Sequence, residues 1–419
     1  MPNSAVPTGQ RTPRRISWDI LRVVAIVAVM LGHVTHQSAL LHPELSGYPF
    51  RVTAQFGASI LLTISAYFVC ASLRKGSPGR WLWSRVARLV PVYLVAVLLT
   101  YVVTRYAVTL FNGQALPGGI GGFLFGVPSE ALNAGPVPWY TPTGLDLFAN
   151  LTMIQAWSFD FQYLDGSYWT LPVQLMAFTA AALLWPRRWR TDRRVVVLLW
   201  ALIAVPVVIR FVVFTPETIP PALNNIFFGL GLHRLNAFAF GVAAWFWAQR
   251  RLPTWHLGLL LVATVAAQDL QMFPLHHPTP IDPERVPSIV GFAVMLILVC
   301  LAARGPDWDV PFVRRLRPVI TWIAGISFGL YLVHQELGYI LARVLLDRGV
   351  PGWLRLVAVL GAAVLGGWLL TKLVERPVHR VLTARRGRPV PAEPVAEGAP
   401  GAAPSQVEGV APVSVGGAS

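Results

Sequence analysis

The sequence is short of charge. Only 13% of its 419 residues are Asp, Glu, Lys or Arg, whereas a soluble domain carries about 25%. Hydrophobic residues make up 55% of the chain, and they collect in long runs rather than alternating with polar residues. This combination excludes an ordinary soluble globular protein and predicts an all-α, polytopic transmembrane helix bundle.

Cysteine and internal repetition are also scarce. Cys70 and Cys300 both lie within apolar runs, so the sequence predicts no disulfide framework, and we find no internal repeat. The first apolar run follows basic residues, as in a signal peptide. Because Arg22 interrupts this run and no A-x-A cleavage site follows it, we expect an uncleaved first span.

Lysine is nearly absent, so arginine supplies almost all of the net charge of +15. The arginines fall in short blocks between apolar runs, which excludes a contiguous nucleic-acid-binding surface. Residues 106–186 contain no Lys or Arg. By the positive-inside rule, this pattern places both termini in the cytoplasm and the 106–186 loop outside. The preference for arginine over lysine favours a GC-rich bacterial source.

About twenty apolar residues are needed to cross a bilayer, and the chain offers about ten such segments. We expect spans at 16–40, 52–72, 85–107, 168–186, 194–214, 234–249, 256–271, 287–303, 318–344 and 353–374. The expected domains are a flexible cytoplasmic N-terminus (1–15), one transmembrane domain (16–380) and a disordered cytoplasmic tail (381–419), because the tail is rich in Pro, Ala and Gly.

The first span carries ionisable residues. On an α-helix, Asp19, Arg22 and His33 share one stripe, because eleven residues make about three turns. One interpretation is interfacial, with Arg22 at the inner headgroups and His33 at the outer ones. However, the ten uncharged residues between them span only about 15 Å, half of the hydrocarbon core. At least one of these groups is then buried in the membrane, where ionisable groups are usually functional.

Five short sequence motifs also occur in a fixed order along the chain. They read "WDILRVVAIVAVMLGH", with the Arg-x10-His spacing, "RWLWSRVARLVPVY", "DGSYWTLPVQLMAF", "ISFGLYLVHQ" and "VERPVHR". Together, over residues 17–380, they resemble the acyltransferase family 3 membrane proteins. One departure is Gln174, where the family commonly has Glu.

The resemblance implies an enzyme that moves an acyl group, commonly acetyl from acetyl-CoA, to a hydroxyl of a sugar, polysaccharide or secondary metabolite. In that chemistry His33 would remove the hydroxyl proton as a general base, or would itself be transiently acylated. Arg22 would orient the thioester or stabilise the oxyanion, and Asp19 would neutralise and position Arg22. We expect no metal and no permanently bound cofactor.

Arg85 and Arg88 lie three residues apart at the foot of the third span. Their position alone is typical of positive-inside arginines, but the family motif favours contacts to the phosphates of acyl-CoA. Trp169 and Gln174 are candidates for acceptor binding, although interfacial aromatic residues are usually anchors. His334 is a further substrate-binding candidate, and a helix–helix hydrogen bond explains it equally well.

The acceptor remains open, since family members modify exported glycans or antibiotics from either side of the membrane. The expected partners are acyl-CoA, such an acceptor and the bilayer of the inner or plasma membrane, without nucleic acid. The alternative function is a transporter or flippase of a polysaccharide or lipid-linked sugar. The lack of an internal repeat argues against that alternative.

Overall fold

The structure, a computed structural model, describes residues 14–73, 77–132, 139–158, 160–184, 192–213, 220–272 and 282–384. Every regular element in these ranges is a helix, which agrees with the all-α prediction. The expected tail and most of the expected N-terminal segment lie outside the described residues, as do several of the basic blocks used to infer topology.

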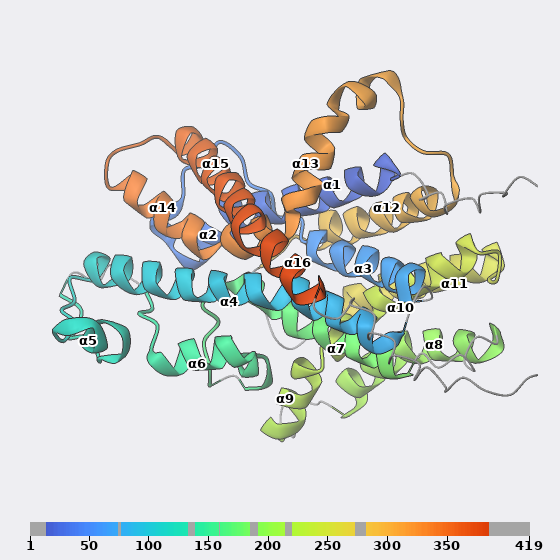
Figure 1. Cartoon of the computed structure of the whole chain (residues 1–419), viewed down its shortest axis with the longest axis horizontal. Coiled ribbons are helices and arrows are strands. Elements are labelled where there is room, and N and C mark those ends of the chain that lie inside the picture. The colour runs from blue at the N-terminus through green and yellow to red at the C-terminus, as the bar shows by residue number, and fades with distance from the viewer. Residues whose placement is uncertain are drawn as a thin grey trace, which may run out of the picture.

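The helices that matter for the site are α1, α3, α4, α7, α10, α13, α14 and α15, arranged as Figure 1 shows. The α-helices are α1 (Ile16–Gly32), α2 (Ser38–Leu41), α3 (Gly57–Leu73), α4 (Pro78–Phe111), α5 (Gly119–Phe125), α6 (Gly144–Thr152), α7 (Thr170–Leu184), α8 (Asp192–Val208), α9 (Pro221–Gly229), α10 (Leu235–Ala248), α11 (Thr254–Met272), α12 (Arg285–Arg304), α13 (Pro311–Val333), α14 (Glu336–Leu346), α15 (Gly352–Leu370) and α16 (Arg376–Ala384). Short π-helical turns extend three of them: η1 (His33–Gln37), η6 (Ile209–Val213) and η8 (Thr371–Glu375).

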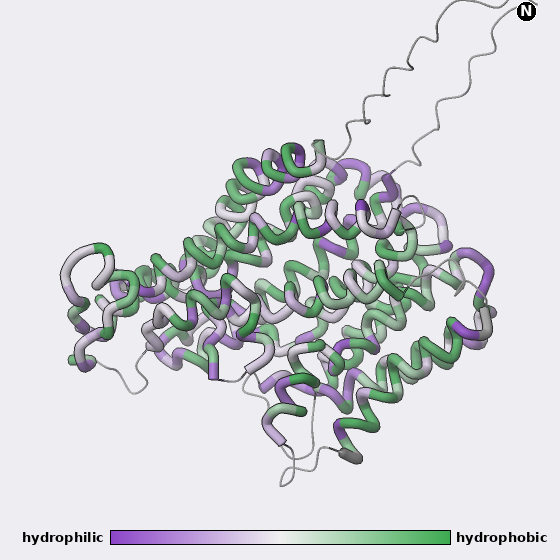
Figure 2. The backbone as a smooth tube through the Cα atoms, turned by 60° about the horizontal axis from the view of Figure 1, so that its bottom comes forward, coloured by the Kyte–Doolittle hydropathy of each residue, from purple (hydrophilic) through white to green (hydrophobic). Residues whose placement is uncertain are grey.

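Many of these helices are long and apolar enough to cross a membrane. Among the described residues, seven pass on length and hydropathy, or eight if α9 and the bent continuation through α10 form one span. Figure 2 shows hydrophobic residues along most of the helical tube. All ten expected segments overlap helices, but α3 has only 17 residues and α10 only 14. The count of ten spans and the cytoplasmic termini therefore remain predictions.

The ninth expected span, 318–344, is wrong as a continuous helix. Helix α13 ends at Val333 and α14 starts at Glu336, so His334 lies at a break rather than inside a span. The backbone N–H of Glu336 donates to Asp165 Oδ2 at 2.9 Å. A carboxylate from a distant loop thus satisfies the exposed helix start, and no local Gly or Pro marks the break in the sequence.

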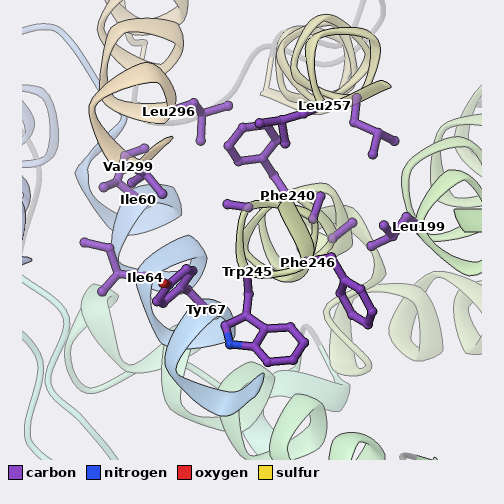
Figure 3. Close-up of a cluster of buried hydrophobic side chains, with 14 of the residues drawn as sticks. Ile60, Ile64, Tyr67, Leu199, Phe240, Trp245, Phe246, Leu257, Leu296 and Val299 are labelled. Atoms are coloured by element: carbon purple, nitrogen blue, oxygen red, sulfur yellow. The ribbon is translucent and has the colours of Figure 1, made fainter. Parts of the chain in front are cut away.

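The largest buried cluster surrounds α10. Figure 3 shows its side chains packed between α3, α8, α11 and α12: Ile60, Ile64, Tyr67, Leu199, Phe240, Trp245, Phe246, Leu257, Leu296 and Val299. At Gly241 a Cβ atom would overlap the carbonyl oxygen of Thr63. Small residues allow membrane helices to approach closely, so this glycine sets the contact between α10 and α3.

A similar contact joins α13 to α15 below the break at His334. A Cβ on Gly329 would overlap the carbonyl oxygen of Gly367, and a Cβ on Gly367 would meet the backbone of Leu330. The two backbones therefore touch directly. This packing fixes the last turn of α13, which presents Tyr331 and His334 to the interior.

The start of α1 is fixed from the α12–α13 loop. Asp307 accepts hydrogen bonds from the backbone N–H groups of Ile16 and Ser17, both at 3.0 Å. Partial burial alone would raise the pKa of Asp307, but the hydrogen bonds from Ser17 and Ile16 outweigh it and lower the pKa from its ordinary value. The carboxylate thus caps the helix that carries Arg22 and His33.

Candidate active site

His33, the first candidate site residue, lies where α1 changes from an α-helix to a π-helix. Helix α1 ends at Gly32, and the π-helical turn η1 begins at His33. Such turns occur frequently at functional sites. The turn directs His33 toward the break after α13, where its Nδ1 lies 2.9 Å from His334 Nε2. The two rings are nearly parallel, with centroids 4.9 Å apart.

The partners of this pair determine its protons. His334 Nδ1 lies 2.9 Å from the carbonyl oxygen of Tyr331, which can only accept a hydrogen bond, so this nitrogen carries a proton. In a neutral ring His334 Nε2 is then an acceptor, and His33 Nδ1 must donate to it. The lone pair of a neutral His33 is therefore on Nε2, which makes no hydrogen bond within the described part of the chain.

Asp19 and Arg22 do share one side of α1, but they are not a tight pair. The Asp19 side chain is buried and accepts two hydrogen bonds from Arg14, at 2.7 and 2.8 Å. Arg22 Nη1 is 3.8 Å from Asp19 Oδ1, and its guanidinium lies 5.0 Å from the centre of the Phe68 ring. Arg14 thus takes most of the neutralising role for Asp19, and Arg22 is turned toward α3.

Arg22, Arg85, Arg88 and Gln174 come together around a cavity of about 160 Å³, which we call the arginine cavity. Its further lining includes Ser65, Phe68, Thr170, Phe178, Ser327 and Tyr331. The lining combines α1, α3, α4, α7 and α13, elements far apart in the sequence. Four of the eight predicted site residues therefore line one cavity.

The arginine cavity has an excess of positive charge. Arg88 Nε donates to Glu375 Oε1 at 2.7 Å, whereas Arg85 donates to the hydroxyl of Ser72 at 3.1 Å and packs near Trp81. No Asp or Glu is among the described lining residues. Several guanidinium groups facing one space with incomplete neutralisation are suited to a phosphate-bearing ligand.

His33 does not itself line the arginine cavity. It lies eleven positions after Arg22, about 16 Å along the helix axis. The connection runs through α13, because Tyr331 lines the cavity and its carbonyl oxygen contacts His334. The cavity and the histidine pair are two adjoining parts of one helix bundle.

Trp169 belongs to a different space. It lines a second cavity of about 470 Å³ together with Gln155, Gln162, Phe228, His233 and Arg234, which we call the Trp169 cavity. Helix α7 separates the two spaces, since Thr170 and Gln174 face the arginine cavity while Trp169 and Val173 face the other. The two acceptor candidates, Trp169 and Gln174, are thus not neighbours in one pocket.

The sequence reasoning missed three residues that shape this region. Asp165 caps α14 and also accepts from Ser167 N–H at 2.8 Å, Tyr331 links the arginine cavity to His334, and Glu375 accepts a hydrogen bond from Arg88. Asp165 and Tyr331 stand inside or beside the quoted segments, so their position was a usable signal. Nothing local predicts the pairing of Glu375 with Arg88, 287 residues away.

The fold and site define a helical membrane protein with an arginine-lined cavity beside a buried histidine pair. A family model described as an acyltransferase domain, acyltransferase family 3, matches residues 15–372. The chain therefore belongs to this family of membrane acyltransferases. No significant match was found among curated proteins or among solved structures.

Proposed function

We propose that the protein is a membrane O-acyltransferase that moves an acyl group, most simply acetyl, from acyl-CoA to a hydroxyl of a carbohydrate or secondary metabolite. The observation that carries the proposal is the arginine cavity, in which Arg22, Arg85 and Arg88 converge and whose described lining contains no Asp or Glu. A phosphate-rich donor such as CoA matches this charge. Family membership supports the acyl-transfer chemistry.

In this proposal the arginines hold the donor. Arg85 and Arg88 bind phosphate oxygens of CoA, and the Arg88–Glu375 bond sets the direction of one guanidinium. Arg22 lies on the wall of the same cavity and orients the donor, because about 16 Å of helix axis separates it from His33. Asp19 acts indirectly, because its carboxylate is held by Arg14 and influences Arg22 only at the longer distance.

His33 is the proposed general base. Its Nε2 takes the proton of the acceptor hydroxyl while the hydroxyl oxygen attacks the thioester carbon. The C–S bond then breaks, and the proton is returned to the CoA thiolate, so that acyl-CoA and alcohol become ester and CoA. General-base catalysis contributes roughly 10²–10⁴-fold. His334 positions His33 by accepting its Nδ1–H and does not touch the reacting atoms.

The donor side and the substrate contacts follow from the same proposal. The donor enters from the cytoplasm in a cell membrane of bacterial type, and Gln174 contributes an amide to the arginine cavity. Trp169 contacts the acceptor in the second cavity. In the alternative route, His33 Nε2 attacks the thioester carbon, the C–S bond breaks and acyl-imidazole forms; the acceptor hydroxyl then displaces the imidazole, and its proton passes to the CoA thiolate.

The test uses membranes that contain the full chain, incubated with labelled acetyl-CoA and a cell extract as the source of acceptors. The proposal expects free CoA to appear together with a labelled ester, in equal amounts. Membranes without the protein are the control. Uptake of a sugar or lipid-linked sugar without CoA release would reject acyl transfer and favour the transport alternative.

A further inference from the structure

The Trp169 cavity is lined by two side chains that each have a buried nitrogen atom without a hydrogen-bond partner. Arg234 Nε and His233 Nδ1 are both buried atoms without a hydrogen bond among the described residues. The Arg234 guanidinium lies 4.9 Å from the centre of the Trp169 ring, which holds it at the cavity wall. An unsatisfied buried donor is costly, so these atoms are prepared for a ligand.

The charged side chains in the described lining of this cavity carry positive charge only. Arg210 is close enough to interact electrostatically with both His233 and Arg234, and its Nη1 donates to Gln271 rather than to a carboxylate. Two described carboxylates lie behind the lining: Asp160 accepts from the Ser158 hydroxyl at 2.7 Å, and Asp146 Oδ1 accepts from the backbone N–H of Gln162 at 3.0 Å. The described lining itself contains no Asp or Glu.

Arg234 also occupies an unfavourable place for a cation. It precedes the first residue of α10, and a helix start favours negative charge. Along α10 it is also at the end opposite to Arg250 and Arg251. A cation at a helix start is modestly unfavourable, and an anion beside Arg234 would offset this cost. The left-handed turn at Gly231 directs both His233 and Arg234 into this space.

The remaining lining suits a hydroxylated molecule. Trp169, Phe228, Phe161 and Tyr163 supply ring faces, while Gln155 and Gln162 supply amides. The Gln155 Oε1 atom is buried and unpartnered and can accept from a hydroxyl. Aromatic faces with a few polar groups are typical of small-molecule pockets.

We infer that the Trp169 cavity binds an acceptor that carries both hydroxyls and an anionic group, a carboxylate or a phosphate. That the bound molecule is the acyl acceptor rests on the proposed function. That the cavity binds a hydroxylated anion does not. The cavity is also adjacent to the catalytic region, because the Tyr331 side chain interacts electrostatically with Arg234 while its carbonyl contacts His334. The anion would be held by Arg234 and His233, and a hydroxyl would point toward the histidine pair.

The experiment measures thermal stabilisation of the full chain in detergent by three probes: glucuronate, glucose 1-phosphate and neutral glucose. We expect either or both anionic probes to raise the Tm and glucose to be at least tenfold weaker. Stabilisation by glucuronate alone assigns a carboxylate, and stabilisation by glucose 1-phosphate alone assigns a phosphate. Equal shifts by all three probes, or no shift by either anion, would overturn the inference.

Variants locate the binding. Arg234→Gln should raise the half-saturating concentration of the anionic probe about 10- to 100-fold, as expected for loss of a charge-assisted contact, and Arg348→Gln is the matched control on an exposed arginine. If Arg234→Gln does not fold, Arg234→Lys keeps the charge and should bind with intermediate strength. An unchanged affinity in Arg85→Gln separates this cavity from the arginine cavity. An anion effect equal in wild type and Arg234→Gln would place the ligand elsewhere and refute the assignment.

The same protein preparation tests acyl transfer and anion binding in the Trp169 cavity separately. Acetyl-CoA consumption is measured separately on wild-type membranes. If anion binding follows Arg234 but no CoA is released with any acceptor, the proposed function fails and the binding site stands. If CoA is released but the anionic probes behave like glucose, the enzyme stands and the inference about its acceptor fails.

Discussion

Replacement of His334 by Phe removes the acceptor for His33 Nδ1–H while it preserves a flat ring at the break between α13 and α14. The structure places this donor 2.9 Å from His334 Nε2, and leaving such a donor unsatisfied costs about 1–3 kcal/mol. We therefore expect the acyl-transfer rate to fall about 5- to 150-fold, because His33 loses the partner that keeps its lone pair on Nε2.

The assay is a double-mutant cycle on initial rates of CoA release under saturating donor. His33→Ala removes the base, with a loss of roughly 10²–10⁴-fold. If His334 acts only through His33, the double variant is no slower than His33→Ala alone. His36→Gln is the matched control, since His36 bonds to the carbonyl oxygen of Asp282 and has no contact with the pair. It should keep a rate near that of wild type.

Losses that multiply in the double variant would show that His334 acts independently of His33 and would refute the reasoning from proton positions. A rate near wild type for His334→Phe would refute it as well. A folding control is the Tm of each purified variant, which must stay close to that of wild type for the rates to be compared.

The remaining predictions concern the donor site, helix packing and pH. Replacing Arg85 and Arg88 by Gln should raise the KM for acyl-CoA about tenfold or more, because phosphate contacts are charge-assisted. A titration of acyl-CoA at fixed acceptor concentration checks this. An unchanged KM would mean that both arginines only set membrane topology. Gly329→Ala should lower the free energy of unfolding by about 1–3 kcal/mol, because the added Cβ would overlap the backbone of α15. Gly325→Ala on the same helix meets nothing within 4 Å and should be neutral. Equal Tm values for the two variants would contradict the close contact between α13 and α15. The pKa of Asp307 is lowered in the folded protein, so its stabilising effect is present above the ordinary pKa of 3.8 and is lost as the pH falls through the folded-state pKa. The Tm difference between wild type and Asp307→Asn should therefore shrink in acid. A Tm difference that stays constant with pH would exclude the charge effect.

The helical class and the approximate positions of the helices followed from the sequence because apolar runs and helix length are local properties. The segments at 287–303 and 256–271 fall within α12 and α11, a few residues from their observed ends. The break at His334 could not be predicted in this way. It depends on Asp165, which is 171 residues away from Glu336 and meets it only in the folded chain.

In the candidate site, too, local motifs could be predicted from the sequence and long-range contacts could not. The stripe on α1 and the arginine pair on α4 were visible as motifs, and the structure brings Arg22, Arg85 and Arg88 to one cavity. The pairing of Asp19 was expected with Arg22, but Arg14 is closer, because its guanidinium reaches the carboxylate from just before the start of α1. The partner of His33 and the separation of Trp169 from Gln174 depend on how α7 and α13 pack, which no single segment encodes.

The most direct test of the central claim is the initial rate of acyl transfer from acetyl-CoA by membranes that contain either the wild-type chain or His33→Ala at equal amounts. The account predicts that the variant retains donor binding, measured as an unchanged KM for acetyl-CoA, while its rate falls roughly 10²–10⁴-fold. A variant that forms the ester at the wild-type rate would contradict the assignment of His33 as the base.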